Sequence, residues 1–269
     1  VEADGKRISL AGDWKYRIGL SLTGFPPAPV SPVQSSSYPT VLFNAMVKPW
    51  TAFPIKGVIW YQGEANVGRS EQYGDLFPAL ITDWRRQWRS DFPFYFVQLA
   101  NFMESKKIQP DSEWAALREA QTKALKLDQV GMAVTIDIGL ADDIHPKNKQ
   151  EVGRRLALVA LAGSYGKNVS SSAPVFQNYI IKGNKMELDF GQKQDGFQIK
   201  GTTLKGFTIA GPDRVFYPAE AMVHDGKIIL SSTEVPAPLA ARYGWADNPD
   251  CNLYGENGLP VAPFRTDCW

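Results

Sequence analysis

Between residues 56 and 165 the chain alternates short apolar segments with longer segments of helical periodicity. The expected strands are residues 56–62, 92–99 and 132–138. The expected helices are residues 71–88, 112–127 and 149–165, the second with Ser112 as its N-cap. Strand–helix alternation favours parallel strands joined by right-handed crossovers. We therefore predict an α/β fold whose parallel sheet carries helices on both faces.

The segments on either side of this core have other patterns. After Ser170 the chain consists of short, β-branched segments separated by turns, which predicts a small antiparallel β subdomain. Residues 7–18 predict a short strand pair, and the proline- and serine-rich stretch at 25–39 predicts a linker or surface loop. The expected regions are residues 1–40, 41–169 and 170–269.

Two polar turns follow expected strands. Gln62 and Asn66 come after the first strand, and Asp142 and His145 come after the third. Because the carboxyl ends of parallel strands meet at one edge of a sheet, we expect Gln62 and His145 to lie at the same edge. Open α/β sheets bind their ligands there.

Asp142 lies three residues before His145, one of only two histidines. A neutral imidazole accepts a proton near pH 7, and a carboxylate that binds its other N–H fixes the tautomer. We therefore expect the Asp142 carboxylate within hydrogen-bond reach of a His145 ring nitrogen, with His145 as a general base. The alternative is a surface loop in which neither residue is functional.

Other polar residues admit a functional and a structural interpretation. Gln62 and Asn66 carry amide NH₂ groups, which can stabilise an oxygen that becomes negative during a reaction. In the alternative interpretation they bind only the backbone of their own turn. Arg242 and Trp245 lie in a later loop region, where a sugar-stacking or carboxylate-binding role stands against a structural one.

Five stretches of the sequence carry a further signal. They are Trp60-Tyr-Gln-Gly-Glu-Ala-Asn66, Phe92-Pro-Phe-Tyr-Phe-Val-Gln-Leu-Ala-Asn101, Trp114-Ala-Ala-Leu-Arg-Glu-Ala-Gln121, Asp142-Asp-Ile-His-Pro-Lys-Asn-Lys149 and Pro263-Phe-Arg-Thr-Asp267. Together they resemble the sialate O-acetylesterase family, which are carbohydrate esterases of the SGNH-hydrolase type. The resemblance extends over nearly the whole chain from Ile8 and implies a flavodoxin-like three-layer fold.

The resemblance also implies roles for individual residues. By motif position His145 is the general base and Asp142 its orienting carboxylate. The expected oxyanion-binding residues are Gln62, Gly63 and Asn66. The expected substrate-binding residues are Glu64, Arg242 and Trp245.

The sequence departs from the family pattern at the nucleophile. Members carry the nucleophilic serine in an amino-terminal Gly-Gln-Ser-Asn-type block, and this chain contains no Gly-x-Ser-Asn. The serines at 35–37 and 164 lack the strand and sharp turn that would expose a hydroxyl beside a base. We therefore expect this chain to be the C-terminal part of a longer esterase, whose missing amino-terminal segment supplies the serine.

The resemblance implies serine-type hydrolysis of acetyl esters on sugars. O-acetylated sialic acid, in particular the 9-O-acetyl form, is the first expected substrate, and acetylated xylan or another polysaccharide is the alternative. A different class of function is also open, because a chain without the nucleophile block could be a non-catalytic carbohydrate-binding or structural fragment. The resemblance further implies a periplasmic or secreted protein.

The composition removes several other classes of function. The net charge of +1 lacks the basic excess of nucleic-acid-binding proteins, and no apolar run reaches the roughly 20 residues that span a bilayer. Two cysteines and two histidines lack the paired spacing of zinc sites, so we expect neither metal nor cofactor. The sequence leaves open whether Cys251 and Cys268 form a disulfide.

Overall fold

The structure is a computed structural model that describes residues 2–3, 6–7, 38–191 and 196–269. The chain divides into two compact units, residues 1–49 and 50–269. The smaller unit contains an antiparallel pair of short strands, and a π-helical turn at Phe43–Val47 leads into a 3₁₀ turn at Lys48–Trp50. The paired strands are β1 (Glu2–Ala3) and β2 (Lys6–Arg7). The strand pair and linker expected at residues 7–18 and 25–39 lie almost entirely outside the described residues.

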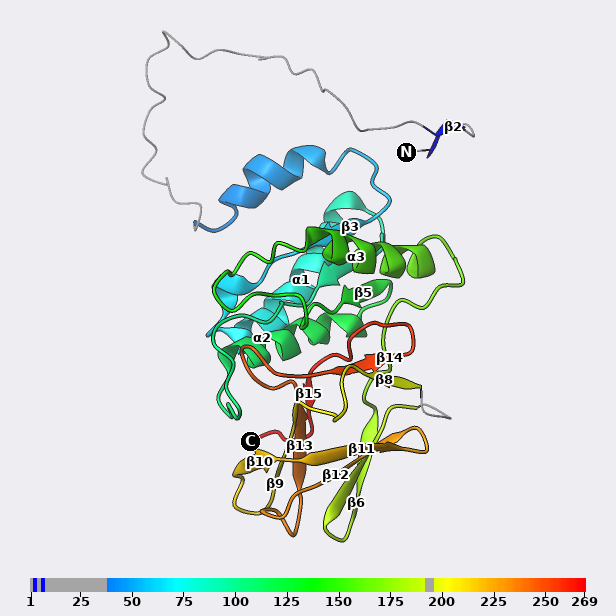
Figure 1. The fold of residues 1–269 in the computed structure, drawn as a ribbon. Helices are drawn as coiled ribbons and strands as arrows, with labels where there is room; N and C mark the ends of the chain where they lie inside the picture. Colours follow the sequence, from blue (N-terminus) through cyan, green and yellow to red (C-terminus); the bar gives the residue numbers. More distant parts are fainter. Residues whose placement is uncertain (1, 4–5, 8–37, 192–195) are drawn as a thin grey trace. The chain divides into compact units, whose positions relative to one another are not determined.

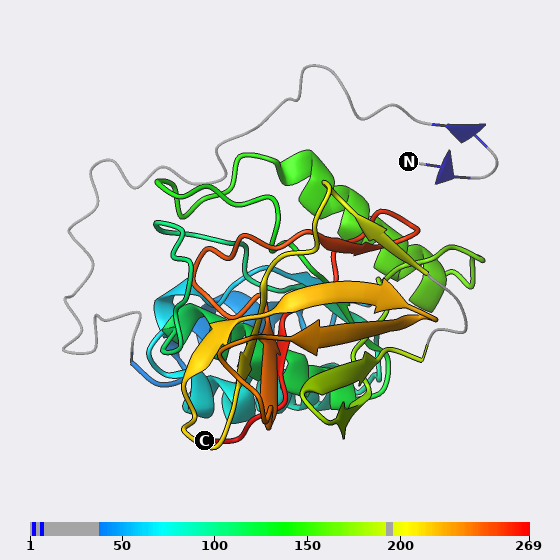
Figure 2. The ribbon, with the colours of Figure 1, turned by 60° about the horizontal axis from the view of Figure 1, so that its bottom comes forward.

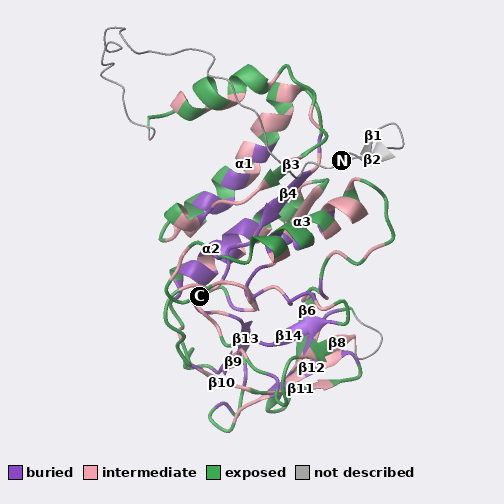
Figure 3. Ribbon diagram, turned by 45° about the horizontal axis from the view of Figure 1, so that its top comes forward, coloured by how far each residue is buried: buried purple, intermediate pink, exposed green. Residues whose placement is uncertain are grey.

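A three-stranded parallel sheet forms the centre of the α/β part of the larger unit (Figure 1). In spatial order its strands are β3 (Val58–Trp60), β4 (Phe94–Val97) and β5 (Val130–Ala133). Every residue of β4 is buried, as the purple ribbon in Figure 3 shows. A strand that is covered on both faces needs a continuous apolar run, and Phe94-Tyr-Phe-Val97 supplies one.

Helices pack on both faces of this sheet. They are α1 (Ser70–Trp88), α2 (Glu113–Thr122) and α3 (Lys149–Gly163). Phe94 and Phe96 join an apolar cluster with α1 and α2, whereas Tyr95 and Val97 join a second cluster with α3. Successive side chains of a strand point to opposite faces, which explains this division. The predicted parallel α/β core is therefore present.

Local signals set the ends of the helices. The Ser112 hydroxyl accepts a hydrogen bond from the backbone N–H of Ala115 at 3.0 Å, which confirms the predicted N-cap. α2 is shorter than expected because it passes into a 3₁₀ turn at Lys123–Lys126. Within the described part of the chain, no helix has the length and apolarity needed to cross a bilayer.

The remainder of the larger unit is built from antiparallel strands, coloured yellow-green to red in Figure 1 and turned forward in Figure 2. One sheet has the order β10-β9-β13-β15, a second has the order β11-β12-β7-β6, and β14 pairs with β8. The predicted antiparallel strands are present, in larger number than expected. Their bounds are Asn178–Lys182 (β6), Lys185–Asp189 (β7), Phe197–Ile199 (β8), Phe207–Ala210 (β9), Phe216–Pro218 (β10), Glu220–His224 (β11), Lys227–Ser231 (β12), Ala240–Tyr243 (β13), Leu253–Gly255 (β14) and Phe264–Arg265 (β15).

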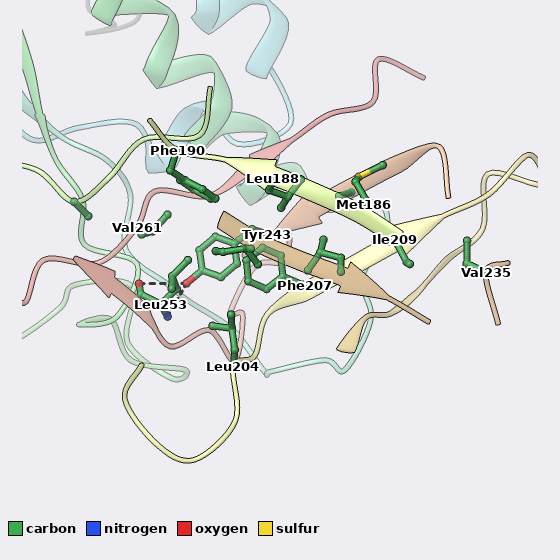
Figure 4. Close-up of a cluster of buried hydrophobic side chains, with 14 of the residues drawn as sticks. Met186, Leu188, Phe190, Leu204, Phe207, Ile209, Val235, Tyr243, Leu253 and Val261 are labelled. Carbon is green, nitrogen blue, oxygen red and sulfur yellow. Dashed lines mark hydrogen bonds between the residues drawn. The ribbon is translucent and has the colours of Figure 1, made fainter. Parts of the chain in front are cut away.

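The larger of two buried apolar clusters forms the core of this β-rich part (Figure 4). Phe207 and Tyr243 lie at its centre with ring centroids 4.6 Å apart. The Tyr243 hydroxyl accepts a hydrogen bond from the backbone N–H of Leu253 at 3.0 Å, so its one polar atom is satisfied inside the core. His224 pairs with Lys227 across the β11–β12 hairpin, as the turn sequence between them predicts.

Candidate active site

The Gln62 turn, residues 62–66, follows the carboxyl end of β3, and the histidine segment, residues 137–148, follows the carboxyl end of β5. Residues in or next to these two segments lie close together. The ammonium nitrogen of Lys149 lies 4.9 Å from the ring centre of Tyr61, the residue before Gln62. Ile144, the neighbour of His145, packs on the apolar cluster against which Tyr61 also packs. The two predicted turns are therefore neighbours at one edge of the sheet.

The Gln62 side chain is held by its own turn and by α1. Its Nε2 donates a hydrogen bond to Asn66 Oδ1 at 2.7 Å, and the Tyr73 hydroxyl donates to Gln62 Oε1 at 3.1 Å. A primary amide has two N–H donors. The bond to Asn66 uses one of them, so the second remains for another acceptor.

Gly63 makes this turn sterically feasible. Its φ of 150° lies in a region that side chains disfavour, and an added Cβ would lie 3.1 Å from Nε2 of Gln121. The next residue, Glu64, begins the 3₁₀ turn Glu64–Asn66 and is half-buried. Its carboxylate makes no hydrogen bond or ion pair with any residue that the structure describes.

Tyr61 provides a further donor beside the turn. Burial, together with the charge of Glu64, raises the pKa of Tyr61 to about 12, so its hydroxyl keeps its proton at neutral pH. The hydroxyl oxygen is buried and has no hydrogen-bond partner among the described residues. An unpaired buried hydroxyl is unusual, which makes Tyr61 a candidate contact for a group that occupies this edge.

The histidine segment presents His145 to solvent. Its side chain is 87% exposed, and its Nδ1 lies 3.8 Å from Oδ1 of Asp143. The same carboxylate oxygen accepts the backbone N–H of His145 at 2.9 Å, so Asp143 is turned back onto its own loop. Asp142 is exposed and makes no hydrogen bond or ion pair with the described residues. The expected contact between Asp142 and His145 is thus not formed. The role of Asp142 as the orienting carboxylate stays a prediction.

Two buried polar residues of α2 organise the edge, and they received no role from the sequence. Gln121 Oε1 accepts the backbone N–H of Leu99 at 2.9 Å, while its Nε2 donates to the carbonyl of Gln62 at 3.2 Å. Arg118 is fully buried and donates to four carbonyls at 2.7–2.9 Å, those of Leu99, Ala100, Ala246 and Asp247. Burial lowers the pKa of Arg118 to about 9, so the guanidinium remains charged at neutral pH. The signal that could have identified them is that both polar residues lie on the apolar face of the helix expected at residues 112–127.

Arg242 and Trp245 lie in the β-rich part. The Arg242 guanidinium forms a bidentate pair with Asp267 at 2.8 and 2.7 Å and donates to the carbonyl of Pro110 at 2.7 Å. Trp245 donates to the same carbonyl at 3.2 Å and lines a cavity of about 380 Å³ with the loop at residues 105–109. The structure records no contact of either residue with the Gln62 turn or the histidine segment.

Neither a disulfide nor a cluster of metal ligands is found among the described residues. Cys251 and Cys268 are both free thiols, and burial raises the pKa of Cys251 to about 12. Within residues 38–191 and 196–269, no three side chains of His, Cys, Asp or Glu gather as a metal site would require.

Comparisons with known proteins agree on one family. Residues 31–162 match the model for carbohydrate esterases described as sialic acid-specific acetylesterase. The chain is 32% identical to a sialate O-acetylesterase of Pongo abelii and 31% identical to that of Homo sapiens, in each case over 93% of this chain and 54% of the relative. A crystal structure of a carbohydrate acetylesterase from Xanthomonas citri superimposes with a TM-score of 0.82 at 46% identity, over 86% of this chain and 55% of that protein. The chain thus spans about half the length of these relatives.

Proposed function

Because the chain belongs to the sialic acid-specific acetylesterase family of carbohydrate esterases, we propose that it supplies part of the active site of an enzyme that hydrolyses acetyl esters on sugars. The observation that carries this proposal is the meeting of the Gln62 turn and the histidine segment at the carboxyl edge of the sheet, through Lys149 and Tyr61. Open α/β enzymes place their chemistry at this edge.

In the proposed mechanism a serine hydroxyl attacks the acetyl carbonyl while His145 accepts its proton. The N–H of Gln62 that Asn66 does not use stabilises the tetrahedral oxyanion, together with backbone N–H groups. His145 then protonates the departing sugar oxygen. It next activates a water molecule that releases acetate, and the serine is regenerated.

The serine belongs, in this proposal, to an amino-terminal segment that adds to the free edge of β3 and completes a three-layer SGNH-type sheet. The state of β3 supports this. β3 is an edge strand of the described sheet, and its Ile59 is 69% exposed, although the residue paired with it, Tyr95, is 5% exposed. An apolar side chain that is left open on an edge strand favours a missing neighbour.

The substrate follows from the family at a coarse level. We propose an O-acetylated sugar, with O-acetylated sialic acid as the first candidate because the mammalian relatives are named sialate O-acetylesterases. Acetylated polysaccharide is the second candidate, because the similar structure from Xanthomonas citri is titled only as a carbohydrate acetylesterase.

The experiment adds the amino-terminal segment to the chain and measures hydrolysis of an aryl acetate. We expect the chain without that segment to be nearly inert. In the completed enzyme we expect His145→Ala to lower kcat by about 10³-fold or more, because the general base is lost. His224→Ala is the matched control, since His224 lies in the β11–β12 hairpin, and should leave kcat unchanged. Activity that survives His145→Ala would overturn the proposal, and an inert completed enzyme would favour the non-catalytic alternative.

A further inference from the structure

An ion pair joins the first residue of the histidine segment to α3, the helix that follows the segment. Asp137, its first residue, accepts two hydrogen bonds from Arg155 of α3, at 2.6 Å from Nη1 and 3.0 Å from Nη2. The Arg155 side chain is 5% exposed and that of Asp137 is 11% exposed. A buried bidentate pair is held in one geometry by its two parallel hydrogen bonds. The pair therefore fixes the start of the histidine segment relative to α3.

Neighbouring groups hold both members of the pair in place. Arg155 Nε donates to Glu151 at 2.7 Å, and Nη1 also donates to the carbonyl of Val134 at 2.7 Å. The Tyr254 hydroxyl donates to Asp137 Oδ2 at 3.1 Å. Burial alone would lower the pKa of Arg155, but its bonds to Asp137 and Glu151 raise it above the ordinary value.

The first residues of the segment are also fixed, whereas the ring of His145 is not. The Gly139 N–H donates to Asn101 Oδ1 at 2.7 Å, and Leu140 forms a parallel bridge with Phe102. Beyond this point the His145 ring is exposed, and the one ion pair that the described structure records for it is with Asp143 of its own loop. The location of the imidazole therefore depends on how the ends of the segment are held.

We infer that Asp137 and Arg155 are a positioning pair that sets the histidine segment against the Gln62 turn. The inference rests on the proposed function, because it assumes that His145 does the chemistry. Neither residue touches the reacting atoms. They act through the backbone of the segment, and a small displacement of a general base is enough to slow a reaction strongly.

The test uses the 269-residue chain itself, because it contains only two histidines. Imidazole NMR signals report His145, and His224 serves as an internal reference. Asp137→Asn weakens the pair yet leaves Glu151 as a partner for Arg155, so the fold should survive. Tyr254→Phe removes a single hydrogen bond to Asp137 and is the milder variant. Arg154→Ala is the matched control, since this neighbouring arginine also binds Glu151 but is 50% exposed.

In Asp137→Asn we expect the His145 signals to shift or broaden while the His224 signals stay unchanged. Backbone amides of residues 138–148 should exchange about tenfold faster, which reflects local opening. Tyr254→Phe should give smaller changes of the same kind, and Arg154→Ala should give none. A variant that melts earlier but keeps the His145 signals and exchange rates of Arg154→Ala would show a merely structural pair and overturn the inference. These readouts do not involve activity, so they remain decisive if the proposed esterase function fails.

Discussion

Arg118 is a buried charge that is matched by backbone carbonyls. Its guanidinium donates to carbonyls that come before α2 in the sequence and to carbonyls that come after it. The described structure shows no ion pair of Arg118 with a carboxylate. A cation surrounded by carbonyl oxygens recovers much of the solvation it loses on burial. Removing it would take a donor from four carbonyls, and the described structure records no other donor for those of Leu99 and Ala246.

We predict that Arg118→Met lowers the free energy of unfolding by about 3 kcal/mol, because the methylene packing is retained while the hydrogen bonds are lost. Urea denaturation followed by tryptophan fluorescence measures this. Arg86→Met is the control, since Arg86 is 77% exposed and pairs only with Asp83, and it should change stability by less than about 0.5 kcal/mol. Equal effects of the two variants would contradict the role given to Arg118.

Glu151 predicts a dependence of stability on pH. The two hydrogen bonds from Arg154, aided by the one from Arg155, lower the pKa of Glu151 from 4.5 to about 2. A carboxyl group whose pKa is lower in the folded state stabilises the fold above its unfolded pKa, and this stabilisation is lost as the pH falls. We predict a loss of stability between about pH 4.5 and pH 2 that Glu151→Gln reduces. Thermal melts across this range measure it, with the exposed Glu256→Gln as the control that should retain the wild-type slope.

At the scale of single elements, a glycine of the histidine segment and a glycine of the following helix predict opposite effects of substitution by alanine. A Cβ on Gly139 would lie 1.8 Å from the carbonyl oxygen of Asn101, whereas a Cβ on Gly153, inside α3, meets nothing within 4 Å. We predict that Gly139→Ala destabilises the protein by more than about 2 kcal/mol, because backbone must move. Gly153→Ala should stabilise it by about 0.5–1 kcal/mol, since alanine is the better helix former. Opposite signs in thermal melts are the expected result.

Elements with a strong local signal were predictable from the sequence. The buried run at Phe94–Val97 and the capped start of α2 formed as expected, because composition and capping act locally. β13 was not predicted, since Ala240-Ala-Arg-Tyr243 is strand only through its pairing with β9 and β15. Its pairing partners lie far away in the sequence, so no local pattern indicates it.

The candidate site was predictable to a similar extent. Parallel topology placed the Gln62 turn and the histidine segment at one edge, as strand order requires. The contacts of Arg118 and Gln121 could not be derived, because their partners are backbone groups that carry no sequence signature. The choice between Asp142 and Asp143 beside His145 also depends on the path of a loop, which residue spacing does not specify.

At the scale of the whole molecule, the exposed Ile59 of β3 marks the edge where the proposed amino-terminal segment would add to the sheet. We predict that Ile59→Asp changes the stability of the chain by less than about 0.5 kcal/mol, because the side chain is 69% exposed. The same variant should abolish activity when the amino-terminal segment is supplied as a separate polypeptide. Ile180→Asp is the control, since Ile180 is 44% exposed on another edge strand, β6, and should allow full activity. Activity that is retained in Ile59→Asp would place the segment elsewhere.

The donors of α2 also reach the carboxyl-terminal third of the chain. Arg118 binds the carbonyls of Ala246 and Asp247, and Glu119 of the same helix pairs with Arg265 at 2.8 Å. Separating the chain near residue 170 would deprive Arg118 of two of its four acceptors and would break the pair of Glu119 with Arg265. The α/β part and the β-rich part therefore share contacts that neither keeps alone, so we expect that exchanging the β-rich part for that of a relative would cost stability.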